Sequence, residues 1–275
     1  MRRYAGQHLV IKFGGHAMGE EAFIRSFAED VVLLHQVGAK PVVVHGGGPQ
    51  IGQMLEKLRI ESRFINGLRV TDAATVSVVE MVLAGAINKA LAAAITSAGG
   101  KAVGISGKDG NLIVASKLLG EPSGDSAVEN TDLGFVGTPE KINPEVINAL
   151  VDAGMIPVIA PVASGADGAT YNINADTAAG AVSAGMGARR LLMLTDVAGV
   201  IGKDGTVMPH LTMAEAAALI EDGTISGGMI PKVQTCMDAV NGGAEAAVIL
   251  DGRQPHAVLV ELFTEQGVGT ILTSN

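Results

Sequence analysis

The chain has 275 residues, 48% of them hydrophobic and only 3% aromatic, which is enough apolar material for one large α/β domain or two lobes sharing a sheet. Its formal net charge of −9 argues against nucleic acid or an anionic membrane surface as the main partner. The single cysteine, Cys236, excludes an internal disulfide and a cysteine-based metal cluster, so we expect it to pack in the core.

The N-terminal residues 1–8 lack the apolar stretch of a signal peptide. We also expect no segment of the chain to span a bilayer. These two features together favour a cytoplasmic protein with no membrane partner.

Short aliphatic runs, typical of buried parallel strands, alternate with helical patterns along the chain. The runs are Leu9–Phe13, Pro41–His45, Ala102–Ile105, Ile156–Ala160, Leu191–Thr195 and Ala246–Leu250. This β/α alternation predicts an α/β fold, a three-layer αβα sandwich with a mainly parallel central sheet. Right-handed crossovers would bring the carboxyl ends of these strands to one edge.

Two helices have recognisable starts. Asp72 is the predicted N-cap of a helix that runs to about Ser97. That helix is apolar nearly all round, which fits either a central helix or one half-buried in a subunit interface. Thr212 followed by Glu215 is a capping-box pattern, which predicts a second helix to about Glu221.

Loops and lobes are less sharply marked. Leu118–Leu133 contains proline, glycine and several acids, and is typical of an exposed loop between short strands. The weakest division of the chain lies near Gly187–Arg190. We therefore predict two lobes, an N-terminal one of residues 1–188 and a C-terminal one of residues 189–275.

Four glycine-rich turns are each predicted to follow the end of a strand. They are Lys12–Gly15, His45–Gly48, Gly107–Gly110 and Gly227–Gly228. Glycine lets backbone N–H groups approach an anion closely, and a helix that starts after such a turn aims its positive end at the same point. Lys12 lies in the first turn and Lys232 just past the last. This combination predicts a site for phosphoryl groups.

Other site classes are disfavoured by missing motifs. The sequence has no G-x-x-x-x-G-K-[ST] loop, no G-x-G-x-x-G and no H-R-D or D-F-G of protein kinases. The His45–Gly48 turn is similar to the oxyanion loop of some esterases, but the G-x-S-x-G elbow that an esterase needs is missing. No spacing of histidine and acidic residues suggests a protein-bound metal. Any Mg²⁺ would arrive with a nucleotide and stay largely water-bound.

Five motifs, in order along the chain, resemble the amino acid kinase family, and within it the branch that acts on N-acetyl-L-glutamate. They are Ile11–Gly15 (IKFGG), Val44–Gln50 (VHGGGPQ), Asn66–Thr71 (NGLRVT), Tyr171–Asp176 (YNINAD) and Gly228–Val233 (GMIPKV). The first motif also occurs in aspartokinases, but the combination is specific. The resemblance covers residues 9 to 272.

The resemblance implies that ATP phosphorylates the γ-carboxylate of N-acetyl-L-glutamate, a step of arginine biosynthesis that gives N-acetylglutamyl 5-phosphate and ADP. A carboxylate with a reference pKa of about 4.3 is already a nucleophile at neutral pH, so no general base is needed. The protein must instead bring two anions together in line and stabilise the charge on the transferring phosphoryl group. Cations and backbone donors, the groups that the motifs supply, suit that task.

The same resemblance assigns the catalytic residues. It implies that Lys12 lies beside the transferring phosphoryl group and that Lys232 stabilises the leaving phosphate, with Asp176 orienting both lysines. From the residues alone, Lys12 could be a surface lysine, Lys232 a solvated helix lysine and Asp176 an N-cap.

The resemblance also implies the binding residues. Arg69 would clamp the substrate α-carboxylate, although an exposed hairpin arginine is the alternative. Asn172 would hold the N-acetyl end, with Asn174 also assigned to the substrate. The glycines and the nucleotide segments complete the set: Gly47 and Gly48 for the substrate, and Gly14, Gly15, Asp196, Val197, Ala198, Gly199, Val200, Thr224, Ile225 and Ser226 for the phosphates and the nucleotide.

Three alternatives stay open on the sequence: another amino acid kinase such as an aspartokinase, a carrier-linked aminoadipate kinase, and a catalytically silent nucleotide-binding sensor. An aspartokinase would carry a C-terminal regulatory extension. We expect a homodimer. Residues 261–270 resemble the arginine-inhibited branch, whereas most of the N-terminal helix of that branch is not in this sequence. A hexamer and feedback inhibition by arginine therefore stay open.

Overall fold

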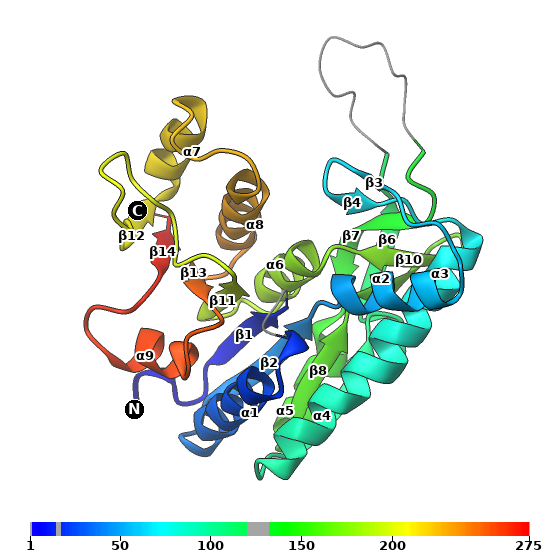
Figure 1. Ribbon diagram of the computed structural model, residues 1–275. Helices are drawn as coiled ribbons and strands as arrows, with labels where there is room; N and C mark the ends of the chain where they lie inside the picture. Colours follow the sequence, from blue (N-terminus) through cyan, green and yellow to red (C-terminus); the bar gives the residue numbers. More distant parts are fainter. Residues whose placement is uncertain (1, 15–17, 120–131, 275) are drawn as a thin grey trace.

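A computed structural model describes residues 2–14, 18–119 and 132–274. Its central sheet contains β1 (His8–Phe13), β2 (Lys40–His45), β5 (Ala102–Ser106), β8 (Ile156–Ala160), β11 (Arg190–Thr195), β12 (His210–Thr212), β13 (Ala246–Asp251) and β14 (Thr270–Thr273). The strand order is β12-β14-β13-β11-β1-β2-β8-β5 (Figure 1). Neighbouring strands run parallel except β13 and β14. All six predicted strands are confirmed to within one residue at each end.

Helices cover both faces of the sheet, which confirms the predicted three-layer α/β architecture. One face carries α1 (Glu21–Gln36), α2 (Gly48–Lys57), α9 (Ala257–Phe263) and a long helix made of α3 (Ala73–Glu80), the π-helical η3 (Met81–Ile87) and α4 (Asn88–Ser97). The other carries α5 (Pro144–Asp152), α6 (Ala175–Gly185), α7 (Met213–Glu221) and α8 (Met229–Asn241). Two short 3₁₀ turns are η1 (Arg2–Tyr4) and η4 (Asp109–Asn111).

Each face of the sheet has its own hydrophobic core. In β1, Leu9, Ile11 and Phe13 belong to the core under α1, whereas Val10 belongs to the core under α6 and α8. Because side chains alternate along a strand, Lys12 lies on the same face as Val10. The strand therefore delivers Lys12 toward α6 and α8.

A small closed barrel flanks the sheet beside β5 and β8. Its strands are β6 (Ile113–Lys117), β7 (Val136–Ile142), β9 (Val162–Gly165) and β10 (Thr170–Ile173), joined in the order β10-β7-β6-β9. A separate hairpin consists of β3 (Phe64–Ile65) and β4 (Leu68–Arg69). β6 and β7 are the short strands predicted on either side of the loop Leu118–Leu133, but residues 120–131 of that loop lie outside the described residues.

Both predicted helix starts are confirmed. The Asp72 carboxylate accepts a hydrogen bond from the Thr75 N–H at 2.8 Å. Thr212 and Glu215 form the reciprocal capping box that opens α7. The capping residues predicted these helix starts correctly because each cap is a contact between residues three positions apart, which needs no tertiary context.

The expectation that no segment could span a bilayer is wrong on length and composition. The continuous helix Ala73–Ser97 passes both criteria, with a mean hydropathy of 1.7 over its most apolar window. The reason is that Glu80 and Lys89 are its only charged residues. In the fold, 44% of that window is buried, and α4 packs against α1 and β5.

The predicted boundary between residues 188 and 189 falls just before β11. That strand pairs in parallel with β1, in a register that places Lys12 opposite Met193. Both proposed lobes thus contribute strands to one uninterrupted sheet (Figure 1). The two-lobe division stays a prediction.

One glycine turn was misplaced. Three of the turns do follow strands, namely β1, β2 and β5, but Gly227–Gly228 lies between helices α7 and α8. The segment reaches the site because it starts α8, not because it ends a strand.

Candidate functional site

A cavity of about 290 Å³ opens at the carboxyl ends of β1 and β2. Seven of the residues singled out in the sequence line it: Lys12, Gly47, Gly48, Arg69, Asn172, Asn174 and Asp176. They come from four separate parts of the chain, so the fold brings four of the five predicted motifs together at this cavity.

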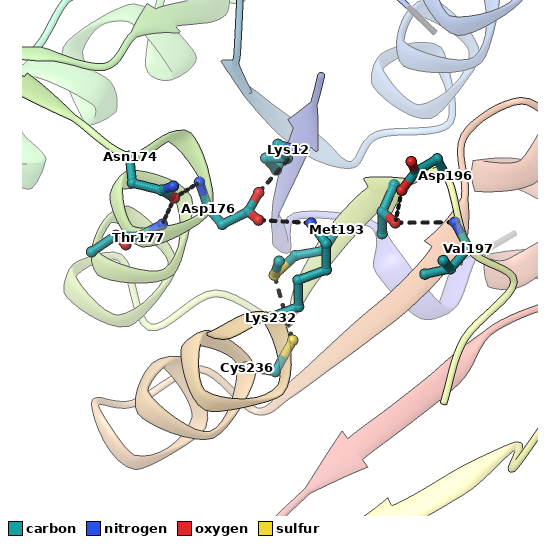
Figure 2. Close-up of polar contacts among 10 residues, drawn as sticks. Lys12, Asn174, Asp176, Thr177, Met193, Asp196, Val197, Lys232 and Cys236 are labelled. Carbon is teal, nitrogen blue, oxygen red and sulfur yellow. Dashed lines mark hydrogen bonds and ion pairs between the residues drawn. The ribbon is translucent and has the colours of Figure 1, made fainter. Parts of the chain in front are cut away.

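Asp176 is held between two lysines at this cavity (Figure 2). The Lys12 Nζ lies 2.9 Å from Asp176 Oδ1, and the Lys232 Nζ donates to Asp176 Oδ2 at 3.0 Å. The three side chains are mostly buried, with 9%, 16% and 22% of Lys12, Asp176 and Lys232 exposed. The arrangement brings one negative and two positive charges together at the carboxyl ends of the parallel strands.

The ionisation of Asp176 follows from these contacts. Burial raises the pKa of the Asp176 carboxyl, but the two ammonium groups outweigh burial and leave its pKa below the usual value. The carboxylate is therefore charged at neutral pH. One net positive charge remains for an incoming anion.

Helix α6 positions Asp176, and its N-cap is Asn174. The Asn174 Oδ1 accepts from the Asp176 N–H at 2.8 Å and from the Thr177 N–H at 3.1 Å (Figure 2). The alternative interpretation of Asp176 as the N-cap is therefore wrong. Because Asn174 satisfies the helix end, the Asp176 side chain is free to turn toward the lysines. Asn174 also lines the cavity, but its Oδ1 already accepts these two bonds.

Gly14 is the residue that gives Lys12 its room. A Cβ at Gly14 would lie 3.0 Å from the Lys12 Nζ and 3.4 Å from the Gly46 backbone N. A side chain at this position would fill the space beside the ammonium group. Gly15, predicted to bind phosphate, lies outside the described residues.

The turn after β2 is packed as tightly as the turn after β1. A Cβ at Gly47 would meet the side chains of Ile87 at 2.3 Å and Leu83 at 2.7 Å. Gly47 is also the N-cap residue of α2, which begins at Gly48 and has no side-chain cap. The first N–H groups of a helix lack partners within it, so the start of α2 offers backbone donors and a positive dipole end to the cavity.

Arg69 is buried, not the exposed hairpin arginine of the alternative interpretation. Only 8% of the residue is exposed, and its guanidinium lies 4.6 Å from the ring centroid of Phe64. Its Nη1 donates to the Ser62 hydroxyl and its Nη2 donates to the Gly48 carbonyl at 2.9 Å. The guanidinium thus lies against the glycine turn, which suits a carboxylate clamp. Asn172, on β10, lines the cavity, and its side-chain amide donates to the Thr71 hydroxyl at 3.4 Å.

The two predicted nucleotide segments adjoin this centre. Residues 196–200 follow β11, the strand next to β1, and residues 224–226 lead into α8, which carries Lys232. The Thr195 hydroxyl accepts from the Val197 N–H at 3.1 Å (Figure 2), and the Thr270 hydroxyl accepts from the Val200 N–H at 2.8 Å. Val200 and Ile225 are 1% and 2% exposed, so their backbones rather than their side chains would face a ligand.

Sequence reasoning missed a buried polar pair, His45 and Asn88, directly behind the glycine turn. His45 belongs to the Val44–Gln50 motif, whose resemblance implies no role for it, and Asn88 belongs to none of the five motifs. Both residues are 0% exposed and their side chains lie 3.1 Å apart. A single asparagine in the middle of a mostly apolar helix is the signal that could have found them.

Two other expectations concern cysteine and metals. Cys236 is fully buried on α8, with its Sγ 3.5 Å from the Met193 Sδ, and burial raises the pKa of its thiol. The core role predicted for it is confirmed. Across residues 2–14, 18–119 and 132–274, no group of three or more His, Cys, Asp or Glu side chains is placed to hold a metal ion.

Comparisons with known proteins place the chain in a family. Residues 7–251 match the model of a family described as the amino acid kinase family. The chain is 60% identical to an acetylglutamate kinase from Parvibaculum lavamentivorans, covering 99% of this chain and 90% of that one. It is 61% identical to an acetylglutamate kinase from Acidiphilium cryptum, covering 99% and 92%.

Among solved structures, the fold is similar to an N-acetylglutamate synthase from Neisseria gonorrhoeae complexed with coenzyme A and N-acetyl-glutamate. The TM-score is 0.83 at 27% identity over all of this chain. This chain spans 61% of the length of the synthase, so the similarity concerns that part alone.

Substitution of Asp176 tests the charge arrangement. Asp176→Asn leaves the two ammonium groups facing each other without a counter-charge. Removing one partner of a buried pair costs about 3–5 kcal/mol, and the partial exposure here reduces the expected loss of unfolding free energy to about 2–3 kcal/mol. Sulfate should then raise the melting temperature of the variant more than that of the wild type. Equal responses to sulfate in the two proteins would contradict an anion site between the lysines.

Proposed function

Because the chain belongs to the amino acid kinase family, we propose that it transfers the γ-phosphoryl group of ATP to the γ-carboxylate of N-acetyl-L-glutamate in arginine biosynthesis. One observation carries the proposal: Lys12 and Lys232 converge on Asp176 beside a cavity rich in backbone donors. A carboxylate acceptor needs no base, and this site supplies cations and N–H groups.

We propose that each of the two predicted lobes binds one of the two substrates. We assign acetylglutamate binding to residues 1–188, because every described residue that lines the cavity lies within them. We assign dimerisation to the same part because it contains the partly buried apolar helix Ala73–Ser97. We assign ATP binding to residues 189–275, because they contain Lys232 and the two predicted nucleotide segments, 196–200 and 224–226. Lys12 would act on the transferring phosphoryl group and Lys232 on the leaving phosphate, while Asp176 holds both ammonium groups in place.

The chemistry of the donor set fits a nucleotide that brings its own Mg²⁺. Both carboxylate oxygens of Asp176 are engaged by ammonium groups, so this side chain suits the orientation of lysines better than the coordination of a metal. When bound, Mg²⁺ would neutralise phosphate charge and be held mainly by phosphate oxygens and water. The bare backbone at Gly14 leaves room for the Lys12 ammonium group, which would face the phosphate oxygens.

We further propose a cytoplasmic homodimer. The helix Ala73–Ser97 is apolar nearly all round, yet it is only partly buried, and Met81 at its middle is 61% exposed. An apolar face of this kind is suited to a second copy of the chain.

Inhibition by arginine has a candidate location where the C-terminal lobe meets the N-terminal residues Arg3 and Tyr4. A second cavity of about 290 Å³ is lined by residues that include Glu261 and Glu265, within the segment that resembles the arginine-inhibited branch. Carboxylates are the natural partners of a guanidinium group.

Trapping of the acyl phosphate tests the function directly. The protein is incubated with ATP, Mg²⁺, hydroxylamine and either N-acetyl-L-glutamate, L-aspartate or L-glutamate. We expect hydroxamate with N-acetyl-L-glutamate alone. Hydroxamate with none of the three acceptors, from a folded protein that binds ATP, would favour the aminoadipate kinase or the silent sensor.

Removal of either lysine should slow the chemical step. We expect Lys12→Ala and Lys232→Ala each to lower kcat by about 10²–10³, or about 3–4 kcal/mol, because each removes one donor to the transition state. Steady-state kinetics on variants with wild-type circular dichroism give the measurement. Undiminished turnover of either folded variant would remove that lysine from the mechanism.

Arg69 should act on binding instead. If it clamps the α-carboxylate equally in the ground and transition states, Arg69→Ala raises KM for N-acetyl-L-glutamate and leaves kcat nearly unchanged. KM for ATP serves as the internal control and should stay constant. A loss confined to kcat would contradict the clamp.

A further inference from the structure

A chain of buried hydrogen bonds runs from the sheet to the glycine turn, through Asn88 and His45 (the elements β2, β8 and α4 are labelled in Figure 1). Neither side chain lines the cavity, and both are 0% exposed. Fully buried polar side chains are retained where their hydrogen bonds fix a geometry. The direction of each bond in this chain can be derived from its neighbours.

The sheet fixes the orientation of Asn88. Its Nδ2 lies 2.9 Å from the Val158 carbonyl oxygen on β8 and 3.1 Å from the Ile105 carbonyl oxygen on β5. Two carbonyl oxygens can only accept, so the Asn88 amide nitrogen must face them. On the other side, the Asn88 Oδ1 accepts from the Lys89 ammonium at 3.3 Å. These partners exclude the flipped amide.

The orientation of Asn88 then fixes the tautomer of His45. The Asn88 Nδ2 also lies 3.1 Å from the His45 Nε2, so that ring nitrogen accepts. The proton of the neutral ring is therefore on Nδ1, which lies 2.8 Å from the Gly46 carbonyl oxygen and donates to it. Burial lowers the pKa of His45 to about 4, so the ring is neutral at physiological pH. The Asn88 amide has two hydrogens for three acceptors, so one hydrogen is shared.

The last bond orients a peptide unit of the site. In a trans peptide the carbonyl and the following N–H point in opposite directions. With the Gly46 carbonyl held by His45, the N–H of Gly47 is turned to the other side of the peptide plane. Gly46, Gly47 and Gly48 all line the cavity beside Lys12.

We propose that His45 is a positioning residue, which fixes the Gly46–Gly47 peptide so that the Gly47 N–H faces the cavity as a donor to the reacting anions. The proposal rests on the proposed kinase function, in which the transferring phosphoryl group and its carboxylate acceptor are those anions. Without the bond from His45, the peptide can rotate and present the Gly46 carbonyl oxygen, which repels an anion.

The surrounding packing supports this role. A Cβ at Gly104 would lie 2.0 Å from the Asn88 Oδ1, so β5 leaves a gap in which the amide fits. Leu83 and Ile87 press on Gly47 from the same helix that carries Asn88. One long helix thus holds the turn through apolar contacts and sets its peptide orientation through Asn88. Because its side chain is fully buried, His45 would act on the reaction through the Gly46–Gly47 peptide.

Two variants of His45 separate positioning from stability. In His45→Asn, the side-chain amide nitrogen can replace Nδ1 and donate to Gly46, while the contact with Asn88 is lost. In His45→Gln, the longer side chain can replace Nε2 and keep Asn88, while the donor to Gly46 is lost. Each variant breaks one bond of the same buried chain, so each is the matched control for the other.

Turnover with N-acetyl-L-glutamate and melting temperature are measured for both. We expect His45→Gln to lower kcat about 10²-fold, the loss of one transition-state donor, and His45→Asn to retain kcat within about 10-fold of the wild type. KM for ATP should stay within about twofold in both. Equal kcat losses, losses that follow the melting temperatures, or a fully active His45→Gln would overturn the proposal.

A measurement on the wild type covers the case in which a variant fails to fold. The ¹⁵N chemical shifts of His45 in uniformly labelled protein report its tautomer. A proton on Nδ1, with Nε2 accepting, supports the positioning role, and a proton on Nε2 overturns it. This result does not depend on the substrate. Absence of hydroxamate from the wild-type protein would therefore count against the proposed function alone.

Discussion

The site depends on the Asp176 carboxylate, which offsets the repulsion between the Lys12 and Lys232 ammonium groups. Lys12 and Lys232 approach the same point from β1 and α8, and their mutual repulsion in a partly buried place would drive them apart. Asp176 lies between them and leaves a net positive charge, so the site is stable when empty and still attracts an anion. The helices α6 and α8, which pack against each other, carry the carboxylate and one of the lysines. The geometry of this charge cluster therefore depends on the packing of α6 against α8.

The rest of the site is built from backbone at the sheet edge. Parallel strands β1 and β2 end side by side, and the glycines after them leave space where side chains would otherwise stand. The Gly46 N–H donates to the Phe13 carbonyl at 2.8 Å, which ties the two turns together. Backbone donors held in this way need little rearrangement when charge moves, which is the property that electrostatic catalysis requires. Arg69 extends the same edge through its bond to the Gly48 carbonyl.

The sequence was sufficient for those parts of the fold that local patterns encode. The six buried strands, the two helix caps and the convergence of Lys12, Arg69 and Asp176 were predicted, because aliphatic runs, capping residues and strand-end glycines are short-range signals. The small barrel was not predicted, since its closure requires β6 to pair with β9 and β7 with β10, and these strands lie far apart in the sequence. Asn174 replaced Asp176 as the N-cap because either residue type can cap. The His45–Asn88 pair joins residues 43 positions apart, which no local pattern reveals.

The pairing of β1 with β11 has a consequence for the way the chain folds during synthesis. Residues 8–13 lie in the middle of the sheet, but their second neighbour is residues 190–195. While the ribosome is still making the intervening segment, β1 and β2 can pair with each other, yet one side of β1 stays an open edge of apolar residues. Such edges are prone to wrong pairing, and long-range parallel pairing is slow. The nascent chain should therefore be most exposed to aggregation, and most dependent on chaperones, until β11 emerges.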